Sequence, residues 1–142
     1  MPAVVPGAAE LQQLFERFAA LSATAVRAVE SGDEAALSAA LDARDLLAPR
    51  TAQLSRALGD ARRNATTRAT RDAVEVALRP VRAAAAEAER LNGELARTAH
   101  AARLGIGEQL DRLRHDSAAR QAYAAVAGRG NGAGRSHLDR TR

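Results

Sequence analysis

The sequence contains no cysteine, no tryptophan and no lysine, and aromatic residues make up only 2% of its 142 residues. Without cysteine, the chain has no disulfide bond, no thiolate nucleophile and no thiolate metal ligand, which fits a reducing compartment. No segment approaches the roughly 20 consecutive apolar residues that a membrane-spanning helix needs. The first ten residues, MPAVVPGAAE, lack the basic and long apolar regions of a secretory signal. We therefore expect a cytoplasmic protein with no membrane span.

The charge of the chain does not indicate nucleic-acid binding, although its isoelectric point is near 11.0. The net charge is only +4, because 17 acidic residues accompany the 21 basic residues. The arginines alternate with acidic residues, which is typical of a solvated helix surface, and the aromatic side chains on which single strands stack are nearly absent. We expect no specific nucleic-acid partner. A basic-tailed nucleic-acid binder is the weakest alternative, and its affinity would fall steeply with salt.

Helix-forming residues dominate what is present. Alanine provides 37 residues, and all 21 basic residues are arginine. Alanine is the best helix former and arginine is close behind it. Leucine, isoleucine, valine and phenylalanine together number only 27, so the apolar core must be thin and lined largely by alanine. The composition predicts an all-α fold, either an antiparallel helical hairpin or a three-to-four-helix bundle, with a long C-terminal helix and a flexible tail.

The N-terminal part of the sequence predicts two amphipathic helices separated by a short break. Residues 1–7 contain two prolines and a glycine and are expected to be a disordered lead-in. Between residues 8 and 30, apolar residues recur in alternating steps of three and four, the spacing of a coiled-coil seam. Gly32 can end this helix in a left-handed conformation, and Ser31 or Asp33 can cap the next one. So short a break predicts an antiparallel hairpin.

The second and third segments contain residues that interrupt helices. Gly59-Asp60 is expected to end the second helix. Pro49 should kink or split that helix, because an interior proline loses a hydrogen bond and clashes with the previous turn. Pro80 marks either a kink or a boundary in the third segment. We expect a helical bundle domain over residues 8–127 and a Gly/Arg-rich flexible tail over residues 128–142.

A further apolar stripe runs along residues 91–113 and carries three glycines. Asn92-Gly93 is a common hairpin turn, but the stripe continues in phase from Leu91 to Leu95, so the spacing predicts a helix. Each glycine lowers helix stability by roughly 1 kcal/mol relative to alanine. A helix weakened in this way is suited to ordering on a partner, so the stripe is either part of the bundle's own core or a partner-binding face. The apolar positions are Leu91, Leu95, Ala102, Ile106, Leu110 and Leu113, and the glycines are Gly93, Gly105 and Gly107.

The sequence shows no arrangement of residues for catalysis or metal binding. The histidines, His100, His115 and His137, do not have the i, i+4 spacing of metal ligands on one helix. Gly105-x-Gly107 is not a phosphate-binding loop, since no strand precedes it and no Gly-Lys-Ser/Thr follows it. We expect a protein that is not an enzyme, with no catalytic residue, no metal ligand and no cofactor.

Several short motifs follow one another in a definite order along the chain. Asp33-x-x-Ala36-Leu37 opens the second helix, and Ala43-Arg44-Asp45-Leu46-Leu47 follows within it. The long C-terminal segment contains Leu91-Asn92-Gly93-Glu94-Leu95, a leucine–asparagine–x–x–leucine pattern. Tyr123 then precedes a glycine, and the tail contains Leu138-Asp139-Arg140. In this order of features, over most of its length, the chain resembles the FlgN/FliT class of flagellar type III export chaperones.

The resemblance implies a small helical chaperone in the cytoplasm. Such a protein binds the helical C-terminal region of a hook-associated or filament-cap subunit, prevents its premature assembly and delivers it for export, so that export-gate or ATPase components are further partners. A weakly ordered helix suits this task, because the energy needed to order it lowers the affinity and eases release. The alternative is a structural coiled-coil protein that self-associates, for example as a homodimer. The partner-binding residues that the resemblance implies are Leu91, Asn92, Leu95, Ile106, Leu110, Leu113 and Tyr123.

Overall fold

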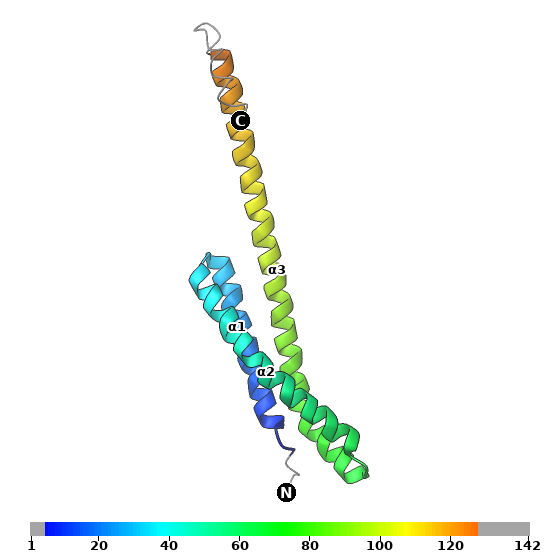
Figure 1. Cartoon of the computed structure of the whole chain (residues 1–142). Helices are drawn as coiled ribbons and strands as arrows, with labels where there is room; N and C mark the ends of the chain where they lie inside the picture. Colours follow the sequence, from blue (N-terminus) through cyan, green and yellow to red (C-terminus); the bar gives the residue numbers. More distant parts are fainter. Residues whose placement is uncertain (1–4, 128–142) are drawn as a thin grey trace. The chain divides into compact units, whose positions relative to one another are not determined.

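The computed structural model describes residues 5–127, and within this part of the chain three helices follow one another with no strand (Figure 1). Helix α1 comprises Ala8–Ser31, α2 comprises Glu34–Asn64 and α3 comprises Arg68–Ala127. The chain divides into two compact units, Met1–Ala102 and Arg103–Arg142. The predicted all-α fold with a long C-terminal helix is confirmed. The tail predicted over residues 128–142 lies outside the described residues.

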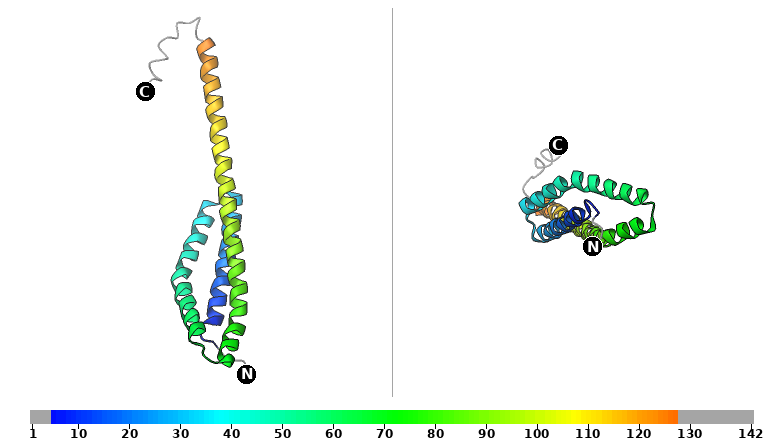
Figure 2. Two further views of the ribbon diagram at one scale, coloured as in Figure 1. Left: turned by 90° about the vertical axis from the view of Figure 1, so that its right-hand side faces the viewer. Right: turned by 90° about the horizontal axis from the view of Figure 1, so that it is seen from below.

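Helices α1 and α2 form an antiparallel hairpin with a two-residue connection (Figure 2). Gly32 has φ 70°, a left-handed conformation that glycine adopts without steric strain, and its N–H donates to the carbonyl of Val29 at 3.2 Å. The carboxylate of Asp33 accepts a hydrogen bond from the N–H of Ala36 at 3.0 Å and so caps α2. The structure confirms that Gly32 ends α1, and it selects Asp33 over Ser31 as the cap.

The chain enters α1 through a packed turn. Gly7 has φ 86°, and a Cβ atom at this position would lie 2.9 Å from Cδ2 of Leu54. Val5 packs against the core and is partly buried. Position 7 therefore requires glycine for its backbone conformation, and a Cβ atom there would also displace the end of the Leu54 side chain. Of the expected disordered lead-in, Val5 and Gly7 are packed in this way and Pro6 is exposed, and residues 1–4 lie outside the described part of the chain.

Helix α2 is longer than its sequence pattern predicts. Pro49 lies inside it without splitting it, and the helix follows a curved path (Figure 2), which is a usual response to an interior proline. The prediction that Gly59-Asp60 ends this helix is wrong, because α2 continues to Asn64. Glycine destabilises a helix by only about 1 kcal/mol. The burial of Leu54 and Leu58 on the adjacent turns offsets that amount.

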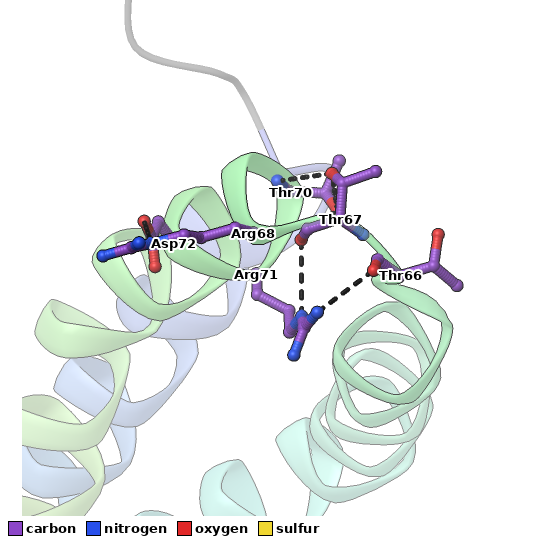
Figure 3. Close-up of polar contacts among 6 residues, drawn as sticks. All are labelled: Thr66, Thr67, Arg68, Thr70, Arg71 and Asp72. Carbon is purple, nitrogen blue, oxygen red and sulfur yellow. Dashed lines mark hydrogen bonds and ion pairs between the residues drawn. The ribbon is translucent and has the colours of Figure 1, made fainter.

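The break between α2 and α3 is closed by local hydrogen bonds (Figure 3). Oγ1 of Thr67 accepts from the N–H of Thr70 at 3.1 Å, and the N–H of Thr67 donates to Oγ1 of Thr70 at 3.2 Å. This reciprocal pair is a capping box in which threonine replaces the usual glutamate or glutamine. Arg71 donates from Nη2 to the carbonyl of Thr66 at 3.1 Å and braces the turn. These contacts start α3 at Arg68.

Helix α3 continues without a break through Pro80 and through Asn92-Gly93. Pro80 is therefore not a boundary between two helices. The prediction that Asn92-Gly93 is helical, and not a hairpin turn, is confirmed. A Cβ atom at Gly93 would contact only Nη1 of Arg97, at 3.4 Å. Glycine at this position is thus not required by a close approach of another helix.

Small apolar side chains from all three helices form the core of the first unit. The larger cluster joins Leu11 of α1, Leu58 of α2 and Val81 of α3. The smaller cluster contains Ala25 and Val26 of α1, Ala40 of α2 and Leu95 of α3. Because alanine exposes little apolar surface in the unfolded chain, its burial contributes little, and the few leucines provide most of the hydrophobic stabilisation. The larger cluster consists of Ala8, Leu11, Leu14, Leu47, Leu54, Leu58 and Val81.

Arginine–carboxylate pairs link the helices at the surface of this unit. Arg50 donates two hydrogen bonds to the carboxylate of Glu10, at 2.6 and 2.7 Å, and connects α2 with α1. Arg62 and Arg82 both pair with Glu75, at 3.0 and 2.8 Å. The hydrogen bonds from arginine lower the pKa of both glutamates.

Between residues 5 and 127, no helix combines the length and the apolar character that crossing a membrane demands.

Candidate partner-binding surfaces

The apolar stripe along residues 91–113 contains a buried position and several exposed ones. Leu95 is only 8% exposed and packs with Val26 of α1 and Ala40 of α2. Leu91, one turn earlier, is half-buried. Leu95 is therefore a core residue of this chain, which corrects its assignment as an anchor for a partner.

The second unit carries the exposed positions of the stripe. Ile106, Leu110 and Leu113 are 57%, 47% and 63% exposed. Their i, i+4, i+7 spacing places them on one side of a helix, which we call the exposed apolar face. Leu104 is 56% exposed, but it lies about 160° around the helix from Ile106. Tyr123 belongs to the same unit, and because its side chain lies outside the described residues, its role stays a prediction.

Gly105 and Gly107 flank the first residue of the exposed apolar face. A Cβ atom at either position would meet no described atom within 4 Å. Neither glycine has a positive φ, and both lie inside α3. Since each lowers helix stability by about 1 kcal/mol relative to alanine, and no described neighbour requires their small size, these glycines weaken the helix without improving its packing.

Asn92 has a partner within its own chain. Nη2 of Arg44 donates to Oδ1 of Asn92 at 3.0 Å. The guanidinium carbon of Arg44 lies 4.3 Å from the centre of the Phe18 ring, a cation–π contact that contributes on the order of 0.5–1 kcal/mol. The three residues come from α2, α3 and α1. This hydrogen bond joins two of the motifs found in the sequence, the one that begins at Ala43 and the leucine–asparagine–x–x–leucine pattern that begins at Leu91.

Beside Asn92, a cavity of about 500 Å³ opens between the helices of the first unit. Its lining is mostly apolar and combines two large aromatic side chains with several methyl groups. The sequence pattern does not predict this surface, because alanines in an alanine-rich helix give no signal that distinguishes a cavity wall from an exposed helix side. The lining includes Phe15 and Phe18 of α1, Ala48 and Ala52 of α2, and Ala85 and Ala88 of α3.

The part of the chain that the structure describes shows no cluster of reactive or metal-binding side chains. No group of three or more histidine or carboxylate side chains there is placed to hold a metal ion. His100 and His115 are both exposed, and Nδ1 of His115 lies 2.8 Å from the carbonyl oxygen of Asp111 in its own helix. Glu87, whose pKa is lowered by hydrogen bonds from Arg90, forms an ordinary surface ion pair.

The described residues therefore present two candidate binding surfaces, and both are apolar. The exposed apolar face of the second unit offers large side chains to a partner, whereas the cavity of the first unit is hollow and receives side chains. Comparison with known proteins found no matching family model, no similar curated protein and no similar solved structure.

Proposed function

We propose that the protein is a cytoplasmic export chaperone that binds the helical C-terminal region of a flagellar hook-associated or filament-cap subunit and prevents its premature assembly. The observation that carries this proposal is the exposed apolar face formed by Ile106, Leu110 and Leu113. Large apolar side chains at i, i+4 and i+7 are the anchors through which one helix docks on another protein. The order of short motifs in the sequence supports the same class of protein.

The size of this face suits a partner that is held and then released. Full burial of a leucine or isoleucine side chain contributes about 1.5–3 kcal/mol, so covering the exposed half of three such side chains contributes on the order of 3 kcal/mol. A micromolar dissociation constant corresponds to about 8 kcal/mol. The partner must therefore contact further residues around the face, and no single contact holds it irreversibly.

Gly105 and Gly107 lower the affinity for such a partner further. Each lowers the stability of the helix by about 1 kcal/mol relative to alanine, so a partner must supply more of the free energy that orders it. This requirement shortens the lifetime of the complex. A chaperone that passes its substrate to export-gate or ATPase components needs such a short-lived complex. The proposed function involves no catalytic step and no cofactor.

The second candidate is a structural coiled-coil protein that associates with itself. The alternating steps of three and four in α1, and the spacing of Ile106, Leu110 and Leu113, are also those of a coiled-coil seam. The two candidates differ in the protein that covers the exposed apolar face. In the first it is an export substrate, and in the second it is the same face of another copy.

Combining Leu110→Asp with Leu113→Asp tests the proposal. The unaltered chain should form a heteromeric complex with one of the purified hook-associated or filament-cap subunits of the same organism, measured by size-exclusion chromatography with light scattering. The double variant should lose this complex and keep its helical circular dichroism, because both leucines are exposed. The matched control is Leu104→Asp, which alters a similarly exposed leucine on another side of the helix and should bind like the unaltered chain.

Two results would contradict the proposal. A stable homo-oligomer that ignores every such subunit would exclude the chaperone function and favour the coiled-coil protein. A global loss of helical signal in the double variant would show that Leu110 and Leu113 belong to the folding core and are not a binding face.

A further inference from the structure

A second cavity continues the first one along the bundle. It has a volume of about 260 Å³ and shares Phe15, Ser55 and Ala85 with the first cavity. Together they form one depression, the α2–α3 groove, with residues 48–62 of α2 and 78–92 of α3 as its walls. Each wall covers 14 residue steps, or about 21 Å at 1.5 Å per residue. The middle of α2 curves away from α3 (Figure 2).

The walls of the α2–α3 groove have the spacing of a helix-packing seam. The lining residues of the first cavity recur at positions i, i+3, i+4 and i+7 on both α2 and α3, which is the repeat of positions that face a partner helix. Most of these side chains are small, so they leave holes into which large apolar side chains fit. The groove thus has the shape that one more helix would fill in a four-helix arrangement. The residues are Ala48, Thr51, Ala52 and Ser55 on α2, and Ala85, Ala88, Glu89 and Asn92 on α3.

We propose that residues 103–127 of a second copy of this chain occupy the α2–α3 groove, with Ile106, Leu110 and Leu113 in its holes. These three side chains are large and exposed, and they recur at i, i+4 and i+7, positions that also occur among the lining residues of each groove wall. A helix of 25 residues is about 37 Å long, which exceeds the length of the groove. Both surfaces are present on every copy of the chain, so a second copy supplies the occupant without any other protein.

The area buried in the contact indicates whether a stable dimer needs one filled groove or two. A groove that encloses half of a helix about 10 Å wide covers about 16 Å of its circumference, or about 330 Å² on each partner over 21 Å of length. When two copies exchange their C-terminal helices, both grooves are filled around a twofold axis, and the buried surface reaches about 1,300 Å². Stable interfaces bury about 1,200–2,000 Å². The exchange therefore gives a stable dimer, whereas one filled groove does not.

This inference does not depend on the proposed function, because both surfaces belong to this chain. It adds a consequence for any partner that binds the exposed apolar face. Such a partner and the groove of the second copy compete for the same three side chains, so binding of the partner should dissociate the dimer.

Single-cysteine variants test the contact directly, because the chain has no cysteine of its own. One variant carries Ala52→Cys in the groove wall and the other carries Leu110→Cys on the exposed apolar face. After mixing and mild oxidation, we expect a disulfide-linked dimer with one chain of each kind, identified by mass spectrometry. The two thiols have an effective concentration of about 1 mM in the complex against about 10 μM in free solution, so linking should be about a hundredfold faster than between thiols that meet only by diffusion. In the matched control, Ala52→Cys mixed with Leu104→Cys, the same helix occupies the groove but carries the second thiol on another side, so linking should be slower.

Three results would overturn the inference. Linking of Leu110→Cys chains only to each other would show that the exposed apolar faces pair directly as a coiled coil. Linking at the rate of the control would show that no second copy occupies the groove. A chain with both Ala52→Cys and Leu110→Cys that closes its disulfide internally at high dilution would make the chain's own helix the occupant. Circular dichroism of each reduced variant verifies that it is folded.

Discussion

Replacing Leu95 with alanine is expected to lower the free energy of unfolding by about 2–3 kcal/mol, while the same replacement at Leu113 should change it by less than about 0.5 kcal/mol. Leu95 is 8% exposed and Leu113 is 63% exposed. Folding therefore removes almost all of one side chain from water and about a third of the other. The cavity left at Leu95 adjoins Val26 and Ala40. Since these neighbours are small and can close part of it, the expected loss lies in the lower half of the range for core leucines.

Thermal unfolding followed by circular dichroism measures this difference. In a unit of about 100 residues, 1 kcal/mol moves the melting temperature by about 4–8 °C, so Leu95→Ala should melt about 10–20 °C below the unaltered protein. Leu113→Ala should stay within about 4 °C of it. Equal shifts in the two variants would refute the division of the apolar stripe into core and exposed positions. An unchanged melting temperature for Leu95→Ala would refute its burial beneath α1 and α2.

The helical glycines and one surface ion pair give two further predictions. Combining Gly105→Ala with Gly107→Ala should slow amide hydrogen exchange around these positions about 30-fold, because it raises helix stability by about 2 kcal/mol. The new methyl groups meet no described atom within 4 Å. Unchanged exchange would contradict the weakening of the helix by glycine. Glu10→Gln should lower the melting temperature near neutral pH but not in strong acid, because the hydrogen bond from Arg50 holds the pKa of Glu10 below its ordinary value of 4.5. That stabilisation is present above the ordinary pKa and is lost as the pH falls through the folded pKa, so equal shifts at both pH values would argue against the pair.

The fold class was predictable because several independent features of the sequence agree. Alanine and arginine favour helix, and the steps of three and four exclude the alternation of a strand. Gly32 and Asp33 mark the first connection with their usual roles, and the structure uses both of them in those roles. Where composition, spacing and turn residues all indicate the same structure, a single sequence is sufficient.

The end of α2 was not predictable in the same way, because two weak signals compete there. Gly59 disfavours helix, but the adjacent turns hold Leu54 and Leu58 in the core, and their burial outweighs the glycine. The signal for the true boundary was present in Thr67 and Thr70. It was missed because threonine takes the place that glutamate or glutamine occupies in the usual capping box.

The candidate site was only partly predictable for a related reason. Spacing identifies the side of a helix on which a residue lies, but not which residues of other helices cover it, so Leu95 and Leu113 look alike in the sequence. The α2–α3 groove had no signal at all, since its walls consist of small residues such as Ala52 and Ala88. Contacts between distant segments, such as that of Arg44 with Asn92, determine which positions of the stripe are covered and where the groove lies. Only the structure shows such contacts.

The two short connections of the first unit also bear on how the chain folds. Each is closed by hydrogen bonds between residues at most five positions apart, at Gly32–Asp33 and at Thr66–Arg71. Helical proteins fold in microseconds to milliseconds when their contacts are mostly local, and these two connections supply the local contacts of this unit. During synthesis we expect α1 and α2 to pair once Asn64 has emerged from the ribosome, and residues 68–102 of α3 to dock onto that hairpin afterwards.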